Sequence, residues 1–160
     1  LFDAIAETGR RLAATGAPRR AVVVLTDGED NASQLTPEDV SGIASSIDVP
    51  VYVLVIVSPL DRIGQSTSSV IDPHLVQQRD GALGNLARWT GGDILLPVSV
   101  ADTTAATRQI VSELRQQYLI AFEPSRQPGW HPLELRTRQT NLVVRARSGY
   151  VVSSRPANRH

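Results

Sequence analysis

The chain has 160 residues, enough for one domain with its own hydrophobic core, and its 41% apolar content is ordinary for a globular protein. Its 16 basic residues, all arginine, balance 16 acidic residues without forming a dense basic stripe, which argues against nucleic acid as the main partner. The lack of cysteine excludes disulfides and thiolate metal sites, and the longest apolar run, residues 49–57, is too short to span a membrane.

The first third of the chain predicts two helices and two strands. Apolar residues at helical spacing in residues 1–16 predict a helix that ends at a glycine. Residues 21–26 and 49–57 are apolar without alternation, which is typical of strands covered on both faces in a parallel sheet. Between them, the sequence Thr-Pro-Glu-Asp at 36–39 predicts the start of a helix that reaches about residue 47.

The middle of the chain continues this alternation. Residues 58–79 are mostly polar and predict a long exposed loop. Residues 81–92 predict a short helix with a glycine stop, residues 93–98 a third strand, and residues 100–117 a helix with Asp102 as its N-cap. Strands that alternate with helices imply right-handed crossovers, so the predicted fold class is α/β with a partial doubly wound parallel sheet.

The last part of the chain has a different pattern. Three strand-like runs, 118–124, 131–138 and 142–152, predict an antiparallel β extension with Tyr118 and Phe122 directed inward. We therefore divide the chain into an α/β portion at 1–117, the extension at 118–152 and a disordered tail at 153–160. Four arginines of the last hairpin predict a solvated cationic face, with an acidic partner as the alternative; they are Arg136, Arg138, Arg145 and Arg147.

The candidate site lies where the first predicted strand ends. Ligands of open parallel sheets bind beyond the carboxyl ends of the strands, and Asp27 is the first residue past such an end. Oxygen ligands without thiolate or histidine suit a hard cation such as Mg²⁺, Mn²⁺ or Ca²⁺. An ordinary turn with solvated acidic residues is the alternative that this pattern leaves open. Asp27 is the candidate metal ligand, and the rim of the loop would be formed by Thr26, Gly28, Glu29, Asp30 and Asn31.

Several segments, in the same order, resemble a von Willebrand factor type A (vWA) domain. VVVLTDGEDN (22–31) resembles its strand and metal loop, and LFDAIAETGRRL (1–12) resembles the preceding helix. VPVYVLVI (49–56) and LGNLARWTGGDILLP (83–97) resemble the next strand and a later segment. Residues 114–152 resemble the carboxyl-terminal extension of the vWA-related subgroup of Acidobacteria and other bacteria. The resemblance implies a Rossmann-like vWA fold that lacks its first strands, with a C-terminal antiparallel β extension.

The resemblance also implies an incomplete metal-ion-dependent adhesion site (MIDAS). In the family this site combines an Asp-x-Ser-x-Ser motif, a threonine from a second loop and an aspartate after the fourth strand. Asp27 matches that aspartate, but the Asp-x-Ser-x-Ser motif is not found in this chain. One carboxylate binds a divalent cation weakly, since such ions take about six or more oxygen ligands, so binding by this chain is expected to be weak or absent. The missing strands would leave an exposed sheet edge through which the chain can self-associate.

The resemblance implies a non-enzymatic, adhesion-type module that binds a protein ligand and that is exported or periplasmic. A structural scaffold domain without a metal site is one alternative. A phosphotransfer enzyme with Asp27 as nucleophile is another. A haloacid dehalogenase-like phosphatase usually needs a second aspartate two residues after the nucleophile, but Glu29 occupies that position here. A receiver domain would need a lysine, and the chain has none.

Overall fold

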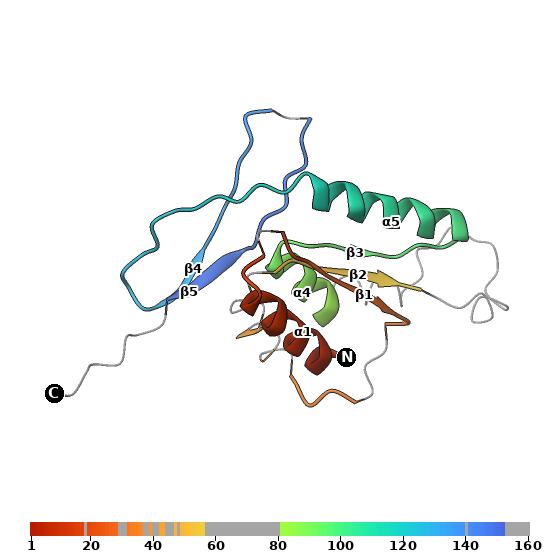
Figure 1. Cartoon of the computed structure of the whole chain (residues 1–160), viewed down its shortest axis with the longest axis horizontal. Coiled ribbons are helices and arrows are strands. Elements are labelled where there is room, and N and C mark those ends of the chain that lie inside the picture. The colour runs from red at the N-terminus through yellow and green to blue at the C-terminus, as the bar shows by residue number, and fades with distance from the viewer. Residues whose placement is uncertain are drawn as a thin grey trace.

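The protein is described here by a computed structural model, shown in Figure 1, which has a mixed α/β architecture. The predicted loop at 58–79 and the tail at 153–160 lie outside the residues that it describes. The described residues are 1–17, 19–28, 32–36, 39, 42–43, 47, 49–56, 81–139 and 141–152.

The main sheet has three parallel strands in the order β1-β2-β3, which confirms the predicted parallel sheet. Helices α1 and α4 lie on one face of this sheet and α5 on the other (Figure 1). Within the described ranges, no helix is both long and apolar enough to cross a membrane. In chain order the elements are α1 (Phe2–Ala14), β1 (Val22–Thr26), β2 (Val51–Val55), α4 (Ala82–Thr90), β3 (Ile94–Leu95), α5 (Val100–Arg115), β4 (Gly129–Pro132) and β5 (Gly149–Val152).

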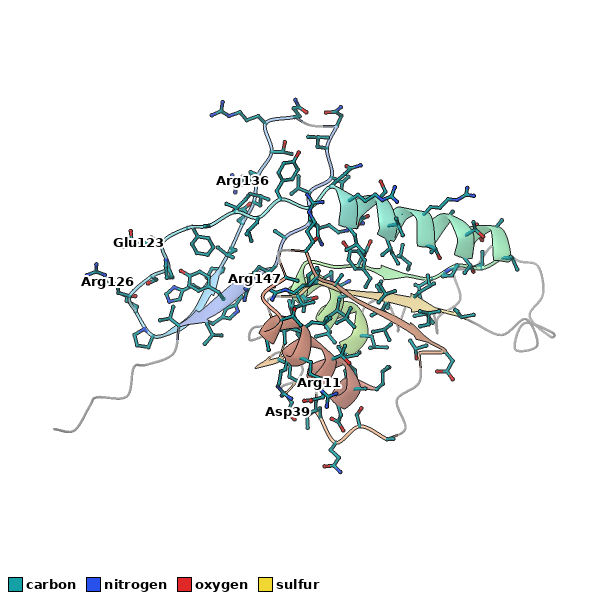
Figure 2. The ribbon with its side chains drawn as sticks, in the orientation of Figure 1. Arg11, Asp39, Glu123, Arg126, Arg136 and Arg147 are labelled. Carbon is teal, nitrogen blue, oxygen red and sulfur yellow. The ribbon has the colours of Figure 1, made fainter. Side chains whose placement is uncertain are left out.

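Helix α1 is amphipathic, as its sequence predicts. Ile5 and Ala6 are buried against the sheet, whereas Arg11 lies on the outer side of the helix (Figure 2) and its Nε donates a hydrogen bond to Glu7 over 2.7 Å. The helix ends before Gly16, whose φ of 66° lies in the left-handed region that favours glycine. The predicted helix and its glycine stop are therefore confirmed.

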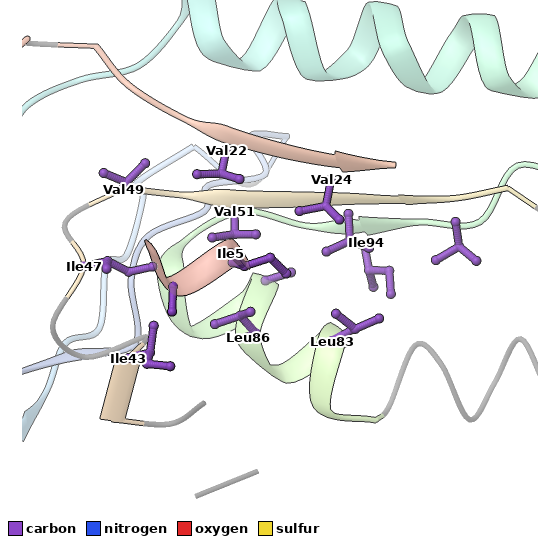
Figure 3. Close-up of a cluster of buried hydrophobic side chains, with 14 residues drawn as sticks. Ile5, Val22, Val24, Ile43, Ile47, Val49, Val51, Leu83, Leu86 and Ile94 are labelled. Carbon is purple, nitrogen blue, oxygen red and sulfur yellow. The ribbon is translucent and has the colours of Figure 1, made fainter. Parts of the chain in front are cut away.

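The hydrophobic core lies between the sheet and the helices α1 and α4 (Figure 3). Leu86 of α4 is 1% exposed, and Val51 and Val53 of β2 are fully buried. The side chains of this core come from α1, β1, β2, α4 and β3 and from the segment before β2, and they include Ile5, Val22, Val24, Ile43, Ile47, Val49, Val51, Leu83, Leu86 and Ile94.

The two long strands of the main sheet differ in how they are covered. Every residue of β2 is buried, as predicted. In β1 only alternate residues are buried, and Val23 and Leu25 are 42% and 64% exposed. The prediction of a doubly buried strand is therefore wrong for β1. Among the described strands β1 pairs only with β2, so it forms an edge of the sheet and its second face is incompletely covered.

The structure describes two predicted helix starts, and the predicted N-cap is confirmed at Thr36 but wrong for α5. The amide and hydroxyl of Thr36 donate hydrogen bonds to Asp39 Oδ2 over 2.8 and 2.9 Å, and the Asp39 amide donates back to Thr36 Oγ1 over 3.3 Å. Most of the helix predicted to follow lies outside the described residues. Helix α5 begins at Val100, but its N-cap is Ser99 and not the predicted Asp102: the Ser99 hydroxyl oxygen accepts the Asp102 amide over 3.1 Å.

The extension is only partly paired. β4 and β5 form an antiparallel pair of four residues each, which confirms the predicted antiparallel direction. The predicted strands 131–138 and 142–152 are wrong over 133–138 and 142–148, which form no strand. Residues 118–124 form no strand. Tyr118 is 90% exposed, so its predicted inward orientation is wrong, since no described neighbour covers it. Phe122 is 51% exposed and meets the ring of Tyr150 edge to face at 5.3 Å.

Candidate functional site

The candidate site lies at the carboxyl edge of the main sheet. Because β1, β2 and β3 are parallel, their carboxyl ends lie at the same edge. Asp27 directly follows β1 and its side chain is exposed there. The Ile56 amide donates a hydrogen bond to the Thr26 carbonyl over 2.8 Å, so the chain leaving β2 runs beside the residue that precedes Asp27.

A tight turn holds Asp27 at this edge. Gly28 has a φ of 95°, a conformation that other residues rarely adopt. Its amide donates a hydrogen bond to Thr26 Oγ1 over 3.0 Å, and the Thr26 hydroxyl donates to Asp27 Oδ1 over 3.4 Å. The structure thus brings the predicted rim residues Thr26 and Gly28 together with Asp27. The other predicted rim residues, Glu29, Asp30 and Asn31, lie outside the described residues.

The described residues do not complete a site for a divalent cation. The turn offers the Asp27 carboxylate and the Thr26 hydroxyl, whereas Mg²⁺ and Ca²⁺ take about six or more oxygen ligands. Over the part of the chain that the structure describes, no group of three or more His, Cys, Asp or Glu side chains is placed to hold a metal ion.

Apolar side chains lie exposed beside Asp27. Val23, Leu25 and Ile56 are 42%, 64% and 43% exposed, and we call these three residues the carboxyl-edge patch. Soluble proteins keep large apolar side chains together at the surface mainly where something binds them. The uninterrupted apolar run at 21–26 predicts a strand buried on both faces, whereas the resemblance to a vWA domain without its first strands predicts an exposed edge and an exposed apolar face at this strand.

A second polar cluster joins the extension to the main sheet. Arg145 lies in the extension and forms ion pairs with Asp93, at 2.5 Å, and with Glu113 of α5. Its side chain is 31% exposed, so the prediction that Arg145 belongs to a solvated cationic face is wrong. The Ser148 amide also donates a hydrogen bond to the Trp89 carbonyl over 3.2 Å. These contacts hold the extension against the end of α4 and the start of β3.

Tyr52 of β2 lies beside this cluster on the face of the sheet that α5 covers. It is 3% exposed. Burial raises the pKa of the Tyr52 phenol from 10.0 to about 12, and the charge of Glu113 and a hydrogen bond with it act in the same direction. The neutral phenol is thus the form that the folded protein stabilises.

The raised pKa of Tyr52 predicts a loss of stability in alkali. Because the folded protein holds this proton more tightly than the unfolded chain, the stabilising contribution is complete below pH 10 and is lost as the pH rises through about 12. We expect the free energy of unfolding to fall over this range, and to fall less steeply in Tyr52→Phe, as measured by urea unfolding at a series of pH values. Tyr118→Phe, at a 90% exposed position, is the control. Parallel profiles for the wild type and Tyr52→Phe would contradict the prediction.

Among the described residues, the carboxyl edge of the parallel sheet thus carries the exposed carboxylate of Asp27 next to exposed apolar side chains. Glu113 and Arg145 pair with each other, and Asp93 pairs with Arg145, so their charges serve to join two parts of the chain.

Comparison with known proteins finds no matching family model, no matching curated protein and no matching solved structure.

Proposed function

We propose that this chain is a non-enzymatic protein-binding module of the adhesion type, and that it binds a protein ligand at the carboxyl edge of its main sheet. The observation that carries the proposal is the exposed Asp27 beside the carboxyl-edge patch. A carboxylate flanked by exposed apolar side chains combines a polar contact that fixes orientation with apolar area that contributes binding free energy.

We further propose the finer fold assignment, a Rossmann-like vWA domain that lacks its first strands. The parallel order β1-β2-β3, helices on both faces and an aspartate directly after β1 support this assignment. The exposed side chains Val23 and Leu25 on the edge strand β1 support it as well, because strands added at that edge would cover them. An exported or periplasmic location belongs to this proposal.

In this proposal Asp27 is one ligand of a divalent-cation site that the described residues do not complete. An ion bound there would offer an open coordination position to a carboxylate of the protein ligand. Two neighbouring residues position the carboxylate of Asp27. The Thr26 hydroxyl donates a hydrogen bond to it, and the turn at Gly28 keeps Asp27 at the sheet edge. We therefore expect binding of Mg²⁺, Mn²⁺ or Ca²⁺ by this chain to be weak.

Titration with Mn²⁺ tests the role of Asp27. We expect this chain to bind Mn²⁺ with a Kd of about 1 mM or weaker, since an incomplete site leaves most ligand positions to water. Asp27→Asn should weaken the binding at least about tenfold, because it removes the charged ligand. Isothermal titration calorimetry or the electron paramagnetic resonance signal of free Mn²⁺ measures both values.

A matched control keeps this experiment specific. Glu134 is an exposed carboxylate of the extension, paired with Arg136 at 2.7 Å, and Glu134→Gln should leave Mn²⁺ binding unchanged. Equal Mn²⁺ affinity for the wild type and Asp27→Asn would exclude Asp27 as a ligand. The coding sequence upstream of Leu1 tests the family assignment: an in-frame Asp-x-Ser-x-Ser motif after an apolar strand supports it.

A structural scaffold domain without a metal site is the second candidate function. The observation that favours it is the lack, over the described ranges, of any group of three metal-ligating side chains. Mn²⁺ binding that does not depend on Asp27, together with no Asp-x-Ser-x-Ser motif upstream of Leu1, would favour the scaffold over the metal-dependent module.

A further inference from the structure

The segment that joins α5 to the extension is exposed and apolar. We call residues 117–123 the joining segment; it runs as an extended chain away from the end of α5 (Figure 1). Tyr118, Leu119 and Ile120 are 90%, 83% and 62% exposed, and Phe122 is 51% exposed. These residues favour β structure, and from Gln117 to Phe122 the segment carries no charge. Such a run is a typical site for pairing with another strand.

The backbone of the joining segment is also available for pairing. Among the described residues, no backbone group of residues 117–124 forms a hydrogen bond with another backbone group. By contrast, β4 and β5 pair with each other over four residues. β-strand addition needs backbone groups that can form hydrogen bonds with a second strand, and side chains that pack against it. The joining segment offers both.

We propose that the joining segment pairs with the joining segment of a second copy of this chain, antiparallel and about a two-fold axis at Leu119. An antiparallel pair of identical strands is self-complementary. A residue a given number of positions after the two-fold axis in one copy lies opposite the residue the same number of positions before it in the other copy. Tyr118 of each copy then lies opposite Ile120 of the other, and Leu119 faces its own counterpart. Aromatic and β-branched side chains stabilise such cross-strand pairs.

Two charged residues, one before the joining segment and one at its end, favour antiparallel pairing with a second copy of this chain. Arg115, the last residue of α5, and Glu123 lie at equal distances in sequence from Leu119. Within the described part of the chain, neither residue forms an ion pair or a side-chain hydrogen bond. An antiparallel pair brings Arg115 of each copy near Glu123 of the other, twice per dimer, whereas a parallel pair would bring like charges together.

The size of the exposed surface indicates a weak dimer. A buried aromatic side chain contributes about 150–250 Å², so Tyr118 and Phe122 together supply roughly 300–500 Å² per copy. Standard stable interfaces bury about 800 Å² per partner. We therefore expect a reversible monomer–dimer equilibrium with a Kd on the order of 10 µM.

Sedimentation velocity of the wild-type chain between about 1 and 200 µM tests the proposal, and we expect a concentration-dependent dimer. Leu119→Asp places two negative charges at the two-fold axis and should raise the dimer Kd at least about tenfold. Arg115→Glu should raise it as well, and the double exchange Arg115→Glu with Glu123→Arg should restore it to within about threefold of the wild type, because the two ion pairs re-form with exchanged signs.

Two controls separate this surface from others. Val100→Asp, at an 85% exposed position at the opposite end of α5, should leave the dimer unchanged. Leu25→Asp, on the edge strand β1, should also leave it unchanged. Far-UV circular dichroism of each variant shows whether it is folded. A chain that stays monomeric at 200 µM, a dimer that Leu25→Asp dissociates, a double exchange that fails to restore the dimer, or growth into open assemblies would each overturn the proposal.

Discussion

Gly92→Ala is expected to lower the free energy of unfolding by about 3 kcal/mol or more, one of the two largest effects that we predict for a single substitution. A Cβ atom at Gly92 would lie 2.0 Å from the carbonyl oxygen of Val51 and 2.5 Å from its carbonyl carbon. Both are backbone atoms of the central strand β2, so neither can move aside without a shift of the sheet. Urea unfolding followed by far-UV circular dichroism measures the loss.

Gly42→Ala is the matched control for this substitution. A Cβ atom at Gly42 would meet nothing within 4 Å, and Gly42 is helical, so alanine there should leave the protein equally stable or more stable by up to about 1 kcal/mol. If Gly92→Ala unfolds at the same urea concentration as Gly42→Ala, the close contact between the end of α4 and β2 is not present in solution. The experiment thus tests the packing that places β3 beside β2.

Leu86→Ala is expected to lower the free energy of unfolding by about 2–5 kcal/mol. Leu86 is 1% exposed and lies at the centre of the core between α4 and the sheet. Its truncation removes buried apolar surface and leaves a cavity among rigid β-branched neighbours such as Val51 and Val53, which cannot close over it. Urea unfolding measures this effect too.

The matched control makes the same change at an exposed leucine. Leu25 is 64% exposed on the edge strand β1, so Leu25→Ala should change stability by no more than about 0.5 kcal/mol. A large loss at Leu25 would show that its face of the sheet is covered in solution, by a second copy or by another segment. That result would contradict the exposed carboxyl-edge patch on which the proposed binding face depends.

Much of the architecture follows from local patterns. The helical spacing of residues 1–16, the uninterrupted apolar runs at 21–26 and 49–57, and the glycine stops at Gly16 and Gly91 predict elements that the structure contains. These signals are local, because a helix cap or a strand needs only its own backbone and the period of its side chains. The alternation of strands and helices then implies the parallel sheet, and with it the position of Asp27 at the carboxyl edge.

The sequence is sufficient to predict the described elements of residues 1–117, the parallel direction of their strands and the place of Asp27 directly after one of them. It is not sufficient for the extension, where the strand predicted at 118–124 is not formed. The tertiary structure was needed to show that Arg145 pairs with Asp93, which is 52 residues away, and that Val23 and Leu25 are exposed although the apolar run at 21–26 predicts burial on both faces. It also decided that residues 118–124 lie unpaired and exposed. The physical reason is that local periodicity encodes which residues prefer a helix or a strand, whereas the cover of a strand and the partner of a charge depend on segments far apart in the chain.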